Sequence, residues 1–172
     1  MTASTDSLVT PIAAVSLQLG PPRLSQSELS GIVTGVTAQP GSWRDLVRYD
    51  PVRRWYHRME LTGDYEVWLL SWCPGQGTGF HDHGGSRGAF AVAQGDLTEQ
   101  TVRGSHQVLA RTVSTGQVRS FGTRYVHNVV NETAVPAVTV HAYSPPLPEM
   151  RRYELTPSGL RWTSTEPAEE TE

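Results

Sequence analysis

The fold is decided by residues 75–95, GQGTGFHDHGGSRGAFAVAQG, which contain His81 and His83 with one residue between them. Side chains two positions apart on a β-strand point to the same face, and their Cα atoms lie about 7 Å apart. Both imidazoles can then bind one metal ion, since neutral imidazole is a common ligand for Zn, Cu, Fe and Ni. Asp82 faces the other side by the same alternation, so we expect no ligand role for it.

The residues after this pair predict a strand and a turn, and a second segment further along the chain again combines a glycine with a histidine. Residues 89–92 have the composition of a buried strand, and Gln94-Gly95-Asp96 that of a turn. Further along, Gly116 precedes His127 by eleven positions, and Asn131 follows it by four. Two surface histidines two apart can also arise by chance, so the metal site is favoured mainly by the two segments together.

The two segments resemble the paired motifs of the cupin family. The resemblance implies a small, jelly-roll-like β-barrel in which His81, His83 and His127 bind a metal. The glutamate position of the cupin motif falls on Gly88, which removes a carboxylate from the ligand set.

Composition excludes several classes of protein. The chain has 172 residues, a net charge of -3, a pI near 6.1 and a mean hydropathy of -0.37. No apolar run approaches the ~20 residues of a membrane span, no secretory leader is evident, and no basic excess suggests nucleic acid. Cys73 is the single cysteine, so no internal disulfide can form and we expect a reducing cytoplasm. We expect a monomer without nucleic-acid or membrane partners.

The pattern along the chain predicts one mainly β domain. We expect a flexible N-terminal segment at 1–24 and a cupin domain at 25–162, with a helical lead-in at 25–50 and the barrel at 52–162. Ser25 and Glu28 have capping-box spacing at the start of the first helix. Ser42 is expected to cap a second short helix at 42–49. Turn residues about every ten positions separate the strands, with a last strand at 153–162 and an acidic tail at 163–172.

A further strand carries a line of polar side chains. Thr139, His141 and Tyr143 alternate with apolar residues and therefore share one face. Buried polar groups are costly unless they are hydrogen-bonded, and a hydroxyl, an imidazole and a phenol in line can satisfy one another. A structural tyrosine beside an unrelated histidine is the alternative interpretation.

Three arginines, Arg53, Arg54 and Arg58, lie near the expected start of the barrel. Arg58 lies on an early strand, where its planar fork suits a bidentate contact with a carboxylate. Arg53 and Arg54 are interpreted as solvated surface charges.

Taken together, these segments resemble the cysteine dioxygenase family. The matching residues are Tyr56-His57-Arg58, His81-Asp82-His83, Gly95, His127 and the run from Thr139 through His141 and Tyr143 to Ser144-Pro145-Pro146. The resemblance implies Fe(II) bound by three histidines and a cis Ser144-Pro145 bond. Mammalian members carry at the position of Gly88 a cysteine that is joined to the tyrosine, so we expect Tyr143 to be unmodified here.

The resemblance also implies an activity, the oxidation of L-cysteine by O2 to cysteine sulfinic acid. Arg58 would bind the substrate carboxylate, and Tyr143 would hydrogen-bond near the reacting atoms. Tyr56 would line the pocket, while His141, oriented by Thr139, would position Tyr143.

Three alternatives stay open. A dioxygenase for 3-mercaptopropionate is the nearest, although members with that preference tend to carry Gln at the position of Arg58, so Arg58 favours cysteine. A non-catalytic cupin that binds a small molecule and a zinc or nickel hydrolase or isomerase are the others.

Overall fold

The computed structural model describes residues 24–168. The flexible segment expected at 1–24 lies outside them except for Leu24. The predicted mainly β architecture is confirmed by eleven strands, in chain order β1 (Tyr56–Leu61), β2 (Glu66–Trp72), β3 (Phe80–Asp82), β4 (Arg87–Gln94), β5 (Asp96–Arg103), β6 (Gln107–Ser114), β7 (Val118–Phe121), β8 (Asn128–Val130), β9 (Ala137–Ser144), β10 (Glu149–Thr156) and β11 (Gly159–Pro167).

The helix α1 (Gln26–Thr37) begins at the predicted capping box. The backbone N–H of Glu28 donates to the Ser25 hydroxyl at 3.3 Å, and the Glu28 carboxylate accepts from the Ser25 backbone at 2.7 Å. Leu29 and Val33 on one face are fully buried. They pack in one apolar cluster with residues of β9 such as Val140, so α1 covers the outer face of that strand.

The second helix predicted at 42–49 is wrong. The chain forms two 3-10 turns instead, Pro40–Ser42 and Arg44–Leu46. The Ser42 hydroxyl donates back to the Gln39 carbonyl at 2.8 Å, so it does not cap a following helix. Trp43 is buried between the two turns, and its anchoring in the core takes the place of a longer helix.

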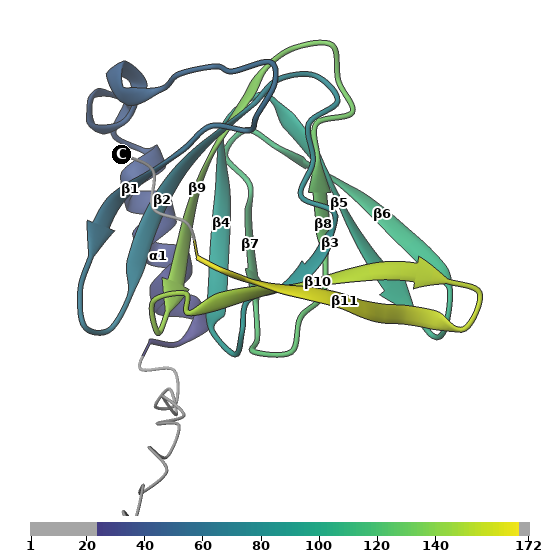
Figure 1. Ribbon diagram of the computed structural model, residues 1–172. Coiled ribbons are helices and arrows are strands. Elements are labelled where there is room, and N and C mark those ends of the chain that lie inside the picture. The colour runs from purple at the N-terminus through teal and green to yellow at the C-terminus, as the bar shows by residue number, and fades with distance from the viewer. Residues whose placement is uncertain (1–23, 169–172) are drawn as a thin grey trace, which may run out of the picture.

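Three sheets make up the β structure (Figure 1). The largest has the order β1-β2-β9-β4-β7, a second has β6-β5-β8, and a third has β11-β10-β3. In Figure 1 the five-stranded sheet faces β8, β5 and β6 across the interior of the molecule, while α1 lies behind the first sheet. The arrangement is jelly-roll-like, and the sheets do not close into one continuous barrel.

Register places the polar line of β9 on the inner face. Trp68 pairs with His141, and Leu70 pairs with Thr139, across the β2–β9 ladder. Trp68 and Leu70 belong to the inner apolar cluster, whereas Val140 belongs to the cluster beneath α1. The predicted alternation of β9 is therefore confirmed.

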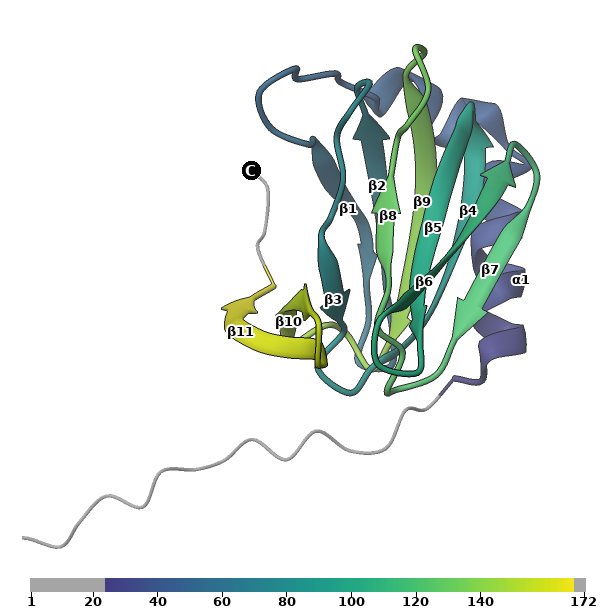
Figure 2. The ribbon, with the colours of Figure 1, turned by 90° about the vertical axis from the view of Figure 1, so that its right-hand side faces the viewer.

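The C-terminal part of the domain is a hairpin. The single strand predicted at 153–162 is wrong, because the chain reverses at Pro157-Ser158 and β10 and β11 pair side by side. The acidic tail expected from 163 is also wrong in its boundary, since residues 163–167 belong to β11. Figure 2 shows the hairpin on the side of the molecule away from α1. Among residues 24–168, no helix has the length and apolar character needed to cross a membrane.

Candidate metal centre

Three buried histidines converge at one end of the interior. Nitrogen atoms of His81, His83 and His127 lie within 4.8 Å of one another. Two short segments bring them together, since His81 and His127 form an antiparallel bridge with backbone N–H···O distances of 2.9 and 3.1 Å. His83 follows β3 directly and lies on the same side as His81, as the two-residue spacing predicts.

Hydrogen bonds fix which ring nitrogen faces the shared point. His81 donates Nδ1–H to the carbonyl of Gly79, and His127 donates Nδ1–H to Glu99, each at 2.9 Å. The partners are acceptors only, so Nε2 of both rings keeps its lone pair for a ligand bond. Both ring nitrogens of His83 are buried and lack a hydrogen-bond partner among residues 24–168. Three neutral nitrogen donors of this kind suit a first-row transition metal such as iron, zinc or nickel.

The environment keeps two of these rings neutral. Burial, followed by the charge of the neighbouring His127, holds the pKa of His81 well below its usual value. Burial, followed by the charges of His81 and His127, does the same to the pKa of His83. A neutral ring is the form that binds a metal, so the lowered pKa of His81 and of His83 favours the binding form of both rings.

A carboxylate stands behind His127, and the sequence analysis missed it. Glu99 is buried and accepts hydrogen bonds from His127, from Arg119 at 2.6 Å and from Tyr125 at 3.2 Å. Burial opposes its ionisation, but the bonds from His127 and Arg119 outweigh burial, so the pKa of Glu99 lies below its ordinary value. The alternation of β5, in which Glu99 shares a face with buried Leu97, could have revealed it.

Gly88 has no room for a side chain. A Cβ atom at this position would lie 2.3 Å from Cε2 of Phe121 and 3.0 Å from Cδ1 of Tyr143. The Phe121 ring stacks on His83 with centroids 4.6 Å apart. The space that a longer side chain at Gly88 would need is therefore filled by the ring that packs against one of the candidate ligands.

The polar line on β9 is a directed hydrogen-bond chain. Trp72 donates its Nε1–H to the Thr139 hydroxyl at 2.9 Å. That hydroxyl lies 2.9 Å from Nε2 of His141, and Nδ1 of His141 lies 3.1 Å from the Tyr143 hydroxyl. Because indole nitrogen only donates, Thr139 accepts from Trp72. The contacts permit Thr139 to donate in turn to His141 and His141 to donate to Tyr143, an arrangement that leaves the Tyr143 O–H for another acceptor.

Burial keeps the groups of this chain uncharged. It raises the pKa of the Tyr143 phenol far above the usual value, with the charge of Glu66 as the next cause. It holds the pKa of His141 well below the usual value, with the charges of His127 and Arg54 adding to the effect. Tyr143 is therefore a neutral phenol that can donate a hydrogen bond.

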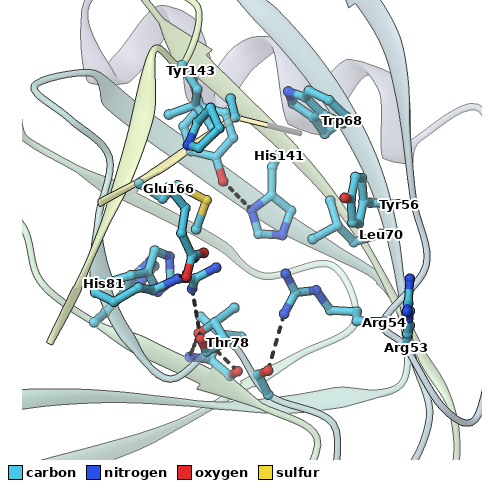
Figure 3. A pocket seen from close by; sticks show the side chains of 18 residues that line it. Arg53, Arg54, Tyr56, Trp68, Leu70, Thr78, His81, His141, Tyr143 and Glu166 are labelled. Carbon is cyan, nitrogen blue, oxygen red and sulfur yellow. Dashed lines mark hydrogen bonds and ion pairs between the residues drawn. The ribbon is translucent and has the colours of Figure 1, made fainter. Parts of the chain in front are cut away.

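These groups line a cavity of about 380 Å³ (Figure 3). Five of the predicted site residues contribute to its wall, namely Tyr56, His81, His127, His141 and Tyr143. The C-terminal hairpin covers another side with Met150, Arg152 and residues 166–168. Arg152 is held by Glu166 at 2.8 Å and by the carbonyl of Thr78 at 2.9 Å.

Arg54 and Arg58 do not lie where the sequence led us to expect them. Arg58, expected to bind substrate, is not among the cavity-lining residues; it lies over the Trp68 ring and 3.9 Å from the Glu66 carboxylate. Arg54, interpreted as a solvated charge, lines the cavity instead, so that interpretation is wrong. Its guanidinium stacks over the Trp72 ring with its carbon 4.8 Å from the ring centroid. Arg53 is exposed at the rim.

A family model and a known relative both match most of the chain. The sequence model of the family described as "Cysteine dioxygenase type I" matches residues 3–156. Human cysteine dioxygenase type 1 is 27% identical over 131 residues, which cover 69% of this chain and 64% of the human protein. The chain thus matches somewhat less than two thirds of that relative.

Solved structures confirm the cupin fold. The protein TT1209 from Thermus thermophilus superimposes with a TM-score of 0.52 at 22% identity, covering 60% of this chain and 93% of its own. A cupin superfamily protein from Desulfitobacterium hafniense gives a TM-score of 0.50 at 9% identity, covering 60% of this chain and 87% of its own. The Ser144-Pro145 bond is cis, as the sequence resemblance implies.

Proposed function

Because the chain belongs to the cysteine dioxygenase type I family, we propose that it is a non-haem iron enzyme that oxidises L-cysteine with O2 to cysteine sulfinic acid. The observation that carries this proposal is the buried set of three converging histidines, two of which line a cavity that also holds the Tyr143 phenol. In the proposed reaction both oxygen atoms enter the product. The thiol sulfur loses four electrons to become a sulfinic acid, and O2 takes up those four electrons.

We assign the metal to His81, His83 and His127. An Fe(II) ion held there would supply sites for the substrate thiolate and for O2, and the three neutral ligands would favour binding of an anionic thiolate. Glu99 is a carboxylate that does not belong to this ligand set, but it is hydrogen-bonded to one of the ligands, His127.

The remaining roles belong to the hydrogen-bond chain and the cavity wall. Tyr143 donates its O–H to an oxygen atom near the reacting sulfur, and its neutral state follows from burial. His141 and Thr139 hold that phenol in place and fix the direction of its hydrogen. Tyr56, which packs edge-on against Trp68 at 5.8 Å, forms an apolar wall with a polar tip.

A second candidate substrate is 3-mercaptopropionate, which shares the thiol and the carboxylate but lacks the amine. In the sequence, Arg58 was the residue that favoured cysteine over 3-mercaptopropionate. Arg58 does not line the cavity, so 3-mercaptopropionate stays a candidate. A direct competition between equal concentrations of the two thiols, with both sulfinates quantified, tests the assignment. L-cysteine sulfinate is expected in excess; an excess of the other product would replace cysteine as the substrate.

A further inference from the structure

Arg54 is a cavity-lining cation without a carboxylate partner in the described part of the chain. Its one hydrogen bond there joins Nη1 to the carbonyl of Gly77 at 3.2 Å, and its Nε is buried without a partner. Figure 3 shows the side chain reaching into the cavity toward His141. Three or more of its five N–H groups are therefore available to another acceptor.

Two other arginines near this wall already face carboxylates. Arg152 bonds to Glu166 at 2.8 Å, and Arg58 lies 3.9 Å from Glu66. The contrast matters because Arg54 is half-buried, and removing part of a charged group from water is costly unless it is paired. A stacked Trp72 ring offsets part of that cost for Arg54, but it leaves the edge of the guanidinium, where the N–H donors lie, open to the cavity.

The surroundings of Arg54 link it to the candidate reaction site. Its stacking partner Trp72 also donates the first hydrogen bond of the chain that ends at Tyr143. Arg54, His81 and His141 line the same cavity, as Figure 3 shows. An anionic group of a bound molecule can meet Arg54 while another part of the molecule reaches the histidines.

We propose that Arg54, not Arg58, binds the carboxylate of the thiol substrate. The inference rests on the proposed function, because that function places a thiol carboxylate in this cavity. A guanidinium matches a carboxylate in a two-point contact, whereas an amide or an ammonium group cannot reproduce both bonds. Arg54 would thus select acidic thiols, and it would do so for L-cysteine and 3-mercaptopropionate alike.

Binding measured without O2 tests the proposal separately from turnover. Iron-loaded wild type, Arg54→Gln, Arg58→Gln and the exposed control Arg103→Gln would be titrated anaerobically by calorimetry. The ligands are L-cysteine and 2-aminoethanethiol, which keeps the thiol and the amine but has no carboxylate. Melting temperatures of the metal-free proteins check folding, and Arg54→Lys serves as a second variant that keeps the charge.

In Arg54→Gln we expect L-cysteine to bind about 30-fold more weakly, as for the loss of a charge-assisted pair, and 2-aminoethanethiol to bind within about 2-fold of wild type. Arg54→Lys should bind L-cysteine with an affinity between those of wild type and Arg54→Gln. The proposal is overturned if L-cysteine binds Arg54→Gln as it binds wild type, or if the carboxylate-specific loss occurs in Arg58→Gln instead. Wild type that binds L-cysteine tightly but never consumes O2 would refute the dioxygenase function while leaving Arg54 as the carboxylate site.

Discussion

His127 donates its Nδ1–H to the carboxylate of Glu99 across 2.9 Å, and both side chains are almost fully buried. The candidate ligand set consists of three imidazoles, and Gly88 has no side chain that could add a carboxylate to it. The contact with Glu99 places a negative charge one hydrogen bond away from the His127 ring, on the nitrogen opposite the one that faces the candidate metal site. Arg119 and Tyr125 hold that carboxylate in turn, so its orientation is fixed.

Glu99→Gln should therefore weaken the metal site while leaving the ligands in place. The amide keeps the size of the side chain but loses the charge that orients His127 and increases its basicity. Loss of such outer partners typically reduces metal affinity by about 10- to 100-fold. Competition with a chelator measures this directly, with Glu154→Gln, which alters an exposed ion pair to Arg161, as the control. Equal iron affinity in Glu99→Gln and wild type would remove Glu99 from the account.

Gly88→Ala should destabilise the fold because its Cβ would overlap the Phe121 ring. Overpacking of this kind typically costs about 1–3 kcal/mol of unfolding free energy. Gly35→Ala is the matched control, since Gly35 lies in α1 with open space around it, and alanine there should be neutral or stabilising. Denaturant unfolding of both variants gives the comparison.

The double variant Gly88→Ala with Phe121→Leu should recover part of that lost stability, because leucine leaves more space beside residue 88. It should still bind iron less tightly than wild type, since Phe121 stacks on His83 and no residue in the described part of the chain holds that ring by a hydrogen bond. Full recovery of iron affinity would show that the stacking contact does not position His83.

Tyr143 should carry no covalent modification. Gly88, whose added Cβ would lie 3.0 Å from the Tyr143 ring, has no sulfur, and the chain's single cysteine, Cys73, comes directly after β2. The intact mass of protein purified after exposure to iron, O2 and L-cysteine should equal the sequence mass. A species lighter by two hydrogens, with Cys73 and Tyr143 joined in one peptide after digestion, would contradict this expectation.

Thr139→Val should disturb the direction of the hydrogen-bond chain. It leaves the buried Trp72 N–H without its acceptor and removes the donor to His141, at a cost of about 1–3 kcal/mol in unfolding free energy. Thr139→Ser keeps the hydroxyl and should restore both stability and turnover. The pH profile of turnover separates the roles: valine frees His141 to change its tautomer and should alter the profile. A profile identical to wild type would mean that Thr139 serves only stability.

The parts of the site that depend on strand periodicity could be predicted from the sequence. His81 and His83, like Thr139, His141 and Tyr143, share a face because residues two apart on a strand point the same way. The capping box at Ser25 depends on local spacing alone, and it formed as predicted.

The parts that depend on packing across the interior could not be predicted. Glu99 meets His127 only when β5 pairs with β8, and Trp72 meets Thr139 only across β2 and β9. Arg54 lies in the segment before β1, where no periodicity indicates direction, and the stacking on Trp72 decides its course. The predicted helix at 42–49 failed for a related reason, since burial of Trp43 outweighed a weak local preference.

The dioxygenase assignment is tested by O2 uptake that depends on L-cysteine, with iron quantified in the same sample. Uptake should rise in proportion to bound iron, one sulfinate should form for each O2 consumed, and His83→Ala should abolish both iron binding and uptake. A verified iron-loaded sample that neither consumes O2 nor forms a sulfinate with L-cysteine or 3-mercaptopropionate would contradict it.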